Sequence, residues 1–182
     1  MSTSSSRVPS GRPGHGEFAS YALADIEQVA GDDAVAALES QERETLALLT
    51  PLGEDAVRGL TYAPGKWTLK QVVGHLADDE RIFAYRALCV ARGDTRPLPG
   101  FDQDVYMRRV DFESRALADL LEEYHSVRRA SLTLFASMTA ESWHRRGIVN
   151  GYEASVRGLA FHIAGHELRH LRALRALYLG ER

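Results

Sequence analysis

A chain of 182 residues with 45% hydrophobic residues and a net charge of −3 has the size and composition of one globular domain. The near balance of acidic and basic residues speaks against a nucleic-acid-binding protein, which favours a basic face. The single cysteine, Cys89, excludes an intramolecular disulfide and a cysteine-based zinc cluster. No apolar run approaches the ~18 residues of a transmembrane helix, so we expect no membrane span and a cytoplasmic protein.

The first 17 residues are rich in serine, proline and glycine and lack an apolar core. They therefore predict a flexible tail and not a secretory signal, and we expect the folded domain to cover residues 18–182. Alternating, β-branched patterns are nearly absent from it, whereas helical periodicity recurs four times. The first helical pattern covers about residues 33–49, and Pro51 and Gly53 end it.

The second helical pattern follows a Pro-Gly turn and continues to about Arg92. Thr68 and Gln71 have the spacing of a capping box at its start. Residues 93–109 form a long connection rich in proline, glycine and aspartate, and loops of this length are often functional.

The third helical pattern runs from about Glu113 to Met138, and the fourth from about Ala154 to Leu179. A second loop, residues 141–153, separates them. Four amphipathic helices with a long crossover between the second and the third predict an all-α fold, a four-helix bundle.

The fourth helix contains His166-Glu167-Leu168-Arg169-His170, the H-E-x-x-H pattern of zinc proteases. A catalytic zinc ion needs a third protein ligand, yet the residues after His170 include no histidine and no aspartate. The protease interpretation therefore fails. On a helical wheel, both histidines fall instead on the apolar stripe of this helix, with Leu159, Ile163, Ala173 and Leu177. Buried imidazoles need partners, because an unpaired buried polar group costs roughly 1–3 kcal/mol. The candidate partners are a metal ion or, alternatively, carboxylates and water.

Four further residues are candidates for the same site. His75 lies on the flank of the second helix's stripe, where periodicity leaves a boundary residue and a metal ligand equally open. His162 lies one turn before His166, and we expect it to contact a metal-binding side chain instead of binding the metal ion itself. Glu80 lies mid-stripe, where a charge is costly unless paired, so we expect an arginine partner or a contact to a ligand. Glu167, on the flank of its stripe, is a candidate for a contact to a ligand or for a general base.

A di-iron site requires two inward-facing Glu-x-x-His pairs in a bundle. The chain has two such pairs, Glu122–His125 and Glu167–His170. Glu122 falls opposite the apolar stripe of its helix, so we expect no di-iron site.

Three stretches carry a resemblance to a known family, namely YAPGKWTLKQVVGHLADDERIFAYRAL, ARGDTRPLPGFDQDVY and RRGIVNGYEASVRGLAFHIAGHELRHLRAL. In these the chain resembles the DinB-like superfamily of damage-inducible and thiol-transferase proteins, over about residues 18–179. The resemblance implies a four-helix bundle, often a homodimer, that binds one divalent metal ion through His75, His166 and His170. Three neutral imidazoles favour zinc or nickel over iron or manganese.

The resemblance also implies a function. Some relatives are bacillithiol- or mycothiol-dependent transferases, and others are called hydrolases. We therefore expect a metal-dependent enzyme in which a low-molecular-weight thiol or water attacks a small electrophilic substrate; the alternative is a non-catalytic metal-binding module of the stress response. Candidate pocket-lining residues, for which ordinary loop packing is the alternative, are Phe101, Asp102, Gln103, Tyr106, Arg146 and Asn150.

Overall fold

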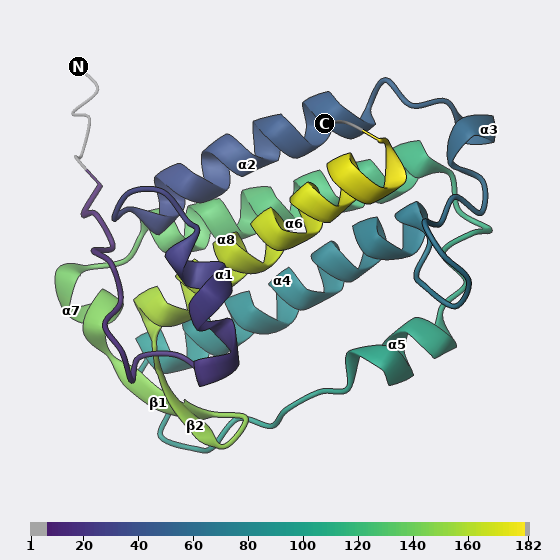
Figure 1. Ribbon diagram of the computed structural model, residues 1–182. Helices are drawn as coiled ribbons and strands as arrows, with labels where there is room; N and C mark the ends of the chain where they lie inside the picture. The colour runs from purple at the N-terminus through teal and green to yellow at the C-terminus, as the bar shows by residue number, and fades with distance from the viewer. Residues whose placement is uncertain (1–6, 181–182) are drawn as a thin grey trace.

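Four long helices form the body of the protein (Figure 1). The computed structural model describes residues 7–180. The long helices are α2 (Ala34–Leu49), α4 (Leu69–Ala91), α6 (Leu117–Ala136) and α8 (Val156–Ala173). Both α2 and α4 pack against α6 and α8. The predicted four-helix bundle is therefore confirmed.

Shorter elements lie between and beside the long helices (Figure 1). They are η1 (Ser20–Ala22), α1 (Leu23–Glu27), α3 (Glu54–Val57), α5 (Gln103–Arg109), α7 (Ala140–His144), β1 (Arg146–Val149), β2 (Tyr152–Ser155) and the π-helical turn η2 (Leu174–Tyr178). Every helix within residues 7–180 is too short or too polar to span a bilayer.

Local hydrogen bonds set the start of the helices that carry the candidate site. The Thr68 hydroxyl accepts from the backbone N–H of Gln71, whose side chain accepts from the backbone N–H of Thr68, so the predicted capping box is present. Ser155 caps α8 by accepting from Gly158 N–H. The third helix begins later than the predicted Glu113, because Asp111 accepts backbone N–H bonds there in a turn.

Two segments that were predicted as loops contain regular structure. The connection after α4 includes α5, and residues 146–155 form an antiparallel hairpin instead of a loop. Its turn is Asn150-Gly151, with φ of +50° and +82°. An Asn-Gly pair with positive φ is the typical signal of a two-residue hairpin turn. Leu98 exchanges backbone hydrogen bonds with Ile148 and Asn150, which fixes the crossover against the hairpin.

The N-terminal segment packs on the start of α8. Residues 1–6 of the predicted tail lie outside the described residues, but residues 7–17 contact the folded domain. Glu17 is ion-paired with Arg157 of α8 at 2.6 Å, and Arg12 donates to the carbonyls of Ile26 and Val29. A side chain at Gly158 would place its Cβ 2.0 Å from the Glu17 carbonyl oxygen, so only glycine allows this approach. The domain boundary at residue 17 stays a prediction.

A layer of polar side chains divides the apolar interior in two. One apolar cluster contains Leu38, Phe83, Phe135 and Phe161, and the other contains Leu49, Leu69, Leu120 and Leu174. Between them, at mid-helix, lie the buried side chains of Thr45, Asp79, Glu80, Arg128, His166 and Glu167, which we call the polar layer. The candidate site is part of this layer.

The apolar stripe of α8 does not run as predicted at its end. Leu177 is 52% exposed, whereas Leu174 is fully buried. The buried face has already moved to Leu171 and Leu174 where the π-helical turn of residues 174–178 begins.

Candidate metal centre

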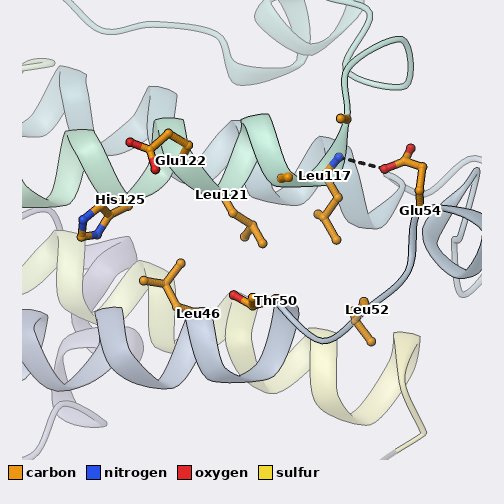
Figure 2. Close-up of a pocket in the computed structure, with 10 residues that line it drawn as sticks. Leu46, Thr50, Leu52, Glu54, Leu117, Leu121, Glu122 and His125 are labelled. Carbon is orange, nitrogen blue, oxygen red and sulfur yellow. Dashed lines mark hydrogen bonds between the residues drawn. The ribbon is translucent and has the colours of Figure 1, made fainter.

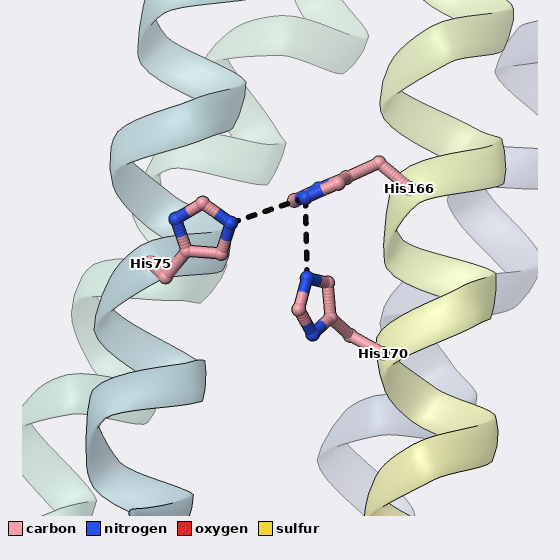
Figure 3. Close-up of side chains that lie close together, drawn as sticks. All are labelled: His75, His166 and His170. Atoms are coloured by element: carbon pink, nitrogen blue, oxygen red, sulfur yellow. Dashed lines mark hydrogen bonds between the residues drawn. The ribbon is translucent and has the colours of Figure 1, made fainter. Parts of the chain in front are cut away.

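Three histidines from two helices converge in the interior (Figure 3). His75 comes from the second turn of α4, and His166 and His170 come from adjacent turns of α8. The Nε2 atom of His166 lies 3.1 Å from that of His75 and 3.2 Å from that of His170. Two nitrogens at ~2.0–2.1 Å from a tetrahedral zinc ion lie about 3.4 Å apart. The spacing of the three nitrogens therefore fits a shared metal ion.

The protonation state of the three imidazoles also fits a metal ion. Burial lowers the pKa of His75 from 6.5 to about 4 and that of His170 to about 3. It lowers the pKa of His166 well below the usual value, and the neighbouring histidines lower it further. All three rings are therefore neutral at pH 7, which is the form that binds metals. The cluster contains only imidazoles, a donor set that suits zinc and nickel.

Two further side chains lie against the rings of this cluster. Asp79 Oδ2 lies 3.3 Å from Nδ1 of His166, on the side of the ring that faces away from the cluster. This oxygen is buried and has no hydrogen-bond partner among the described residues. Burial raises the pKa of the Asp79 carboxyl to about 7, although the nearby Arg86 guanidinium lowers it. The Trp67 ring packs edge-on against His75, with ring centroids 4.7 Å apart.

Asp79 was not among the residues predicted for the site. It lies four residues after His75, so both side chains fall on one face of α4, and this spacing is the signal that could have identified it. Metal-binding histidines usually donate their other ring N–H to a carboxylate, and Asp79 has the position of that acceptor.

Glu167, the glutamate of the H-E-x-x-H sequence, belongs to a different set of contacts. Its carboxylate is ion-paired with Arg128 and accepts hydrogen bonds from Tyr124 and, at 2.7 Å, from Thr45. The Arg128 guanidinium also holds Glu80, at 2.7 Å, and donates to the Leu38 carbonyl. All of these side chains are buried. The structure therefore places Glu80 and Glu167 together on Arg128, in the interior of the bundle.

His162 lies beside the cluster of three histidines and not in it. Its ring stacks on Phe83 at 3.8 Å between centroids and lies parallel to His166 at 5.9 Å. Burial lowers its pKa to about 3, and Arg86 lowers it further. His162 is therefore a neutral, packed ring at pH 7.

Two cavities adjoin the histidines of α8. The Arg86 cavity, of about 440 Å³, is lined by Tyr21, Asp25, Asp79, Phe83, Arg86, Phe101, Gln103, Asn150, His162, His166 and Arg169. The Trp67 cavity, of about 390 Å³, is lined by Tyr62, Gly65, Lys66, Trp67, Val72, Asp104, Arg169, His170, Ala173 and Tyr178. Arg169 belongs to both walls. Each cavity thus reaches one of the α8 histidines, and the two meet at Arg169.

The residues that were predicted to line a pocket fall into two groups. Phe101, Gln103 and Asn150 line the Arg86 cavity. The other three are not part of its wall. Asp102 caps α5, Tyr106 is 45% exposed beside Phe101, and Arg146 is ion-paired with Glu153 across the hairpin.

A third cavity, of about 500 Å³, is separate from His75, His166 and His170 (Figure 2). It lies between α2 and α6, and leucines such as Leu46, Leu117 and Leu121 dominate its walls. The Glu54 carboxylate at its edge accepts the backbone N–H of Leu117 at 2.9 Å and is ion-paired with Lys70. None of the three histidines lines it, so size alone does not identify the functional cavity.

Comparisons with known proteins agree with this geometry. The sequence model of the DinB superfamily matches residues 37–174. One similar solved structure is described as "YfiT from Bacillus subtilis is a probable metal-dependent hydrolase with an unusual four-helix bundle topology"; its TM-score is 0.72 at 17% identity, over 82% of this chain and 87% of that chain. At this identity the likeness shows the fold. No curated protein matches the chain. By the match over most of its length, the chain belongs to the DinB superfamily.

Proposed function

We propose that this protein is a metal-dependent enzyme in which His75, His166 and His170 bind one divalent cation. The observation that carries the proposal is the convergence of three neutral imidazoles beside two cavities, with His75 and His166 buried and His170 partly buried. Zinc and nickel are the proposed metals, because three imidazoles are donors of intermediate softness. YfiT, described as a probable metal-dependent hydrolase, has the same fold and supports this class of function.

A divalent metal ion bound by three imidazoles lowers the pKa of a coordinated water or thiol, so that a nucleophile forms at neutral pH. We propose that this nucleophile, water or a low-molecular-weight thiol, attacks a small electrophilic substrate. The protein's own residues orient the ligands. Asp79 Oδ2 lies 3.3 Å from His166 Nδ1, where a carboxylate that accepted this N–H would keep Nε2 directed at the cluster. The Trp67 ring packs against His75 and limits its rotation.

The contacts of Glu167 argue against a role as general base. Its carboxylate is held by Arg128, Tyr124 and Thr45, and a base must reach the proton that it accepts. We therefore assign Glu167 and Glu80 to the stability of the bundle. His162 becomes a wall of the Arg86 cavity, since its low pKa leaves it a poor proton acceptor at pH 7.

The alternative function, a non-catalytic metal-binding module, predicts a closed site with a fourth protein ligand. Within residues 7–180, the metal-binding cluster consists of three histidines. His166 and His170 also each line a cavity, which leaves room for a substrate beside the cluster. These observations favour the enzyme. A homodimer, as the resemblance implies, and a location in the cytoplasm complete the proposal.

Metal content tests the site directly. Purified protein should contain about one zinc or nickel ion per chain by mass spectrometry, and His166→Ala should lose that ion and melt at a lower temperature. His144→Ala is the matched control, because His144 is exposed on α7 and should change neither property. Protein that holds no stoichiometric metal, with His166→Ala indistinguishable from the control, would contradict the proposed site.

Activity requires a separate assay. The metal-loaded protein should accelerate the reaction of a small thiol with monochlorobimane, or the hydrolysis of a small activated ester, and His75→Ala should lose this acceleration. A rate equal to that of the His75→Ala variant in both assays, with full metal occupancy, would favour the non-catalytic module.

A further inference from the structure

Arg86 is a buried cation that forms no ion pair with any residue of the described range 7–180. Its side chain lies in the wall of the Arg86 cavity and the residue is 3% exposed. It donates one hydrogen bond, from Nη2 to the Pro99 carbonyl, at 2.7 Å. Among the described residues, no carboxylate oxygen lies within 4.0 Å of its nitrogens. A buried charge is costly unless it is paired, so this arginine needs an explanation.

The surroundings hold the guanidinium in one place. Arg86 lies over the ring of Phe83, at 4.7 Å, and over the ring of Phe101, at 5.6 Å. The bond to the Pro99 carbonyl anchors it to the crossover. A guanidinium has five N–H donors, of which one is engaged here, so most of its donors remain for another acceptor.

The acidic groups of the cavity are directed elsewhere. Asp25 is paired with Arg169, at 3.2 Å. Asp79 faces His166 Nδ1. The remaining polar groups of the wall include the amides of Gln103 and Asn150, which carry no charge. Asp79 is near enough for the Arg86 guanidinium to lower its pKa, but it forms no ion pair with Arg86. Arg86 therefore lines the cavity as a guanidinium whose free donors no carboxylate of the described residues occupies.

A continuous stack of planar groups connects Arg86 to the metal centre. Arg86 lies over Phe83, Phe83 stacks on His162 at 3.8 Å, and His162 lies parallel to His166 at 5.9 Å. Since Arg86 and His166 line the same cavity, one small molecule can contact both ends of this stack.

We propose that the Arg86 cavity binds a small organic carboxylate, with the carboxylate on the Arg86 guanidinium and the rest of the molecule against the aromatic stack toward His166. The planar guanidinium fork matches the two oxygens of a carboxylate, and the aromatic walls match an organic acid. As a statement about the substrate class of the enzyme, the inference rests on the proposed function. The binding of the carboxylate itself does not require the metal ion.

Benzoate and benzamide test the inference, because they have nearly the same shape and differ in charge. Their dissociation constants are measured by calorimetry, on the protein as purified and after treatment with a chelator. We expect benzoate to bind at least tenfold more tightly than benzamide in both preparations, a difference of about 1.4 kcal/mol. The two preparations separate this inference from the proposed function. If the protein as purified contains no metal ion, the proposed function is refuted, but the preference for benzoate is still expected.

Arg86→Met removes the charge and keeps a side chain that can pack on the two phenylalanines. It should bind both compounds equally, whereas Arg92→Met, on the exposed end of the same helix, should keep the wild-type preference. Equal affinities in the wild-type protein, a preference for benzoate that survives Arg86→Met, or a preference that vanishes with the metal would each overturn the inference. The wild-type comparison decides the question even where Arg86→Met does not fold.

Discussion

Replacing Glu167 by alanine separates a structural role of the H-E-x-x-H glutamate from a catalytic one. The substitution leaves the fully buried Arg128 with Glu80 as its one acidic partner, and it removes the acceptor for Tyr124 and Thr45. Breaking a buried ion pair by removing one partner costs about 3–5 kcal/mol. In a domain of this size each kcal/mol lowers the melting temperature by roughly 2–4 °C. We therefore expect Glu167→Ala to melt roughly 6–20 °C below the wild-type protein.

The assay combines thermal unfolding by circular dichroism with metal analysis. Folded Glu167→Ala should keep its metal ion, because the three imidazoles do not depend on this carboxylate. Glu122→Ala is the control: Glu122 belongs to the other Glu-x-x-His sequence and is exposed, so its loss should change stability by about 0.5 kcal/mol or less. A Glu167→Ala protein that melts like the wild type and loses turnover would refute the structural role and restore the general base.

Three other predictions concern single side chains. Asp79→Asn should weaken zinc affinity roughly 10–100-fold in a competition assay with a chromogenic chelator, because the acceptor for His166 becomes a weaker one; an unchanged affinity would remove Asp79 from the site. Gly165→Ala should destabilise the protein by about 1–3 kcal/mol in urea unfolding, because its Cβ would lie 2.7 Å from the Asp25 carbonyl group; a midpoint equal to the wild type would show that α1 moves freely. Burial raises the pKa of Glu17, but hydrogen bonds, chiefly from its arginine neighbour on α8, outweigh it and lower the pKa from 4.5 to about 2. The stability that comes from this depressed pKa is therefore present above pH 4.5 and is lost as the pH falls to about 2. Between these pH values the free energy of unfolding should fall by on the order of 2 kcal/mol less in Glu17→Gln than in the wild-type protein. Parallel curves of stability against pH would contradict this.

The helices were predictable because their signals are local. The apolar period of 3.6 residues located all four long helices, and the spacing of Thr68 and Gln71 located the start of α4 to the residue. The hairpin was missed although its signal is equally local. Asn150-Gly151 is a two-residue turn sequence, but the flanking strands have four residues each and show little alternation.

The cluster of three histidines was only partly predictable. His166 and His170 share a face because they are four residues apart on one helix, which places them together before any tertiary contact forms. His75 could not be assigned from its own helix, since a position on the flank of a stripe faces solvent, a neighbouring helix or a ligand according to how the helices pack. The resemblance to the family selected it, and the packing of α4 on α8 brings it within 3.1 Å of His166.

By itself the sequence determined the helices, their order and the pairing of two imidazoles on α8, because these follow from residues within a turn or two of each other. The tertiary structure alone decided which charges meet. Arg128 from α6 comes between Glu80 of α4 and Glu167 of α8, so that the glutamate of the H-E-x-x-H sequence becomes a structural residue. Arg86 lies in the wall of a cavity and forms no ion pair with the described residues. Such contacts join residues far apart in the chain, and no periodicity along one helix specifies how it is rotated and placed against the next.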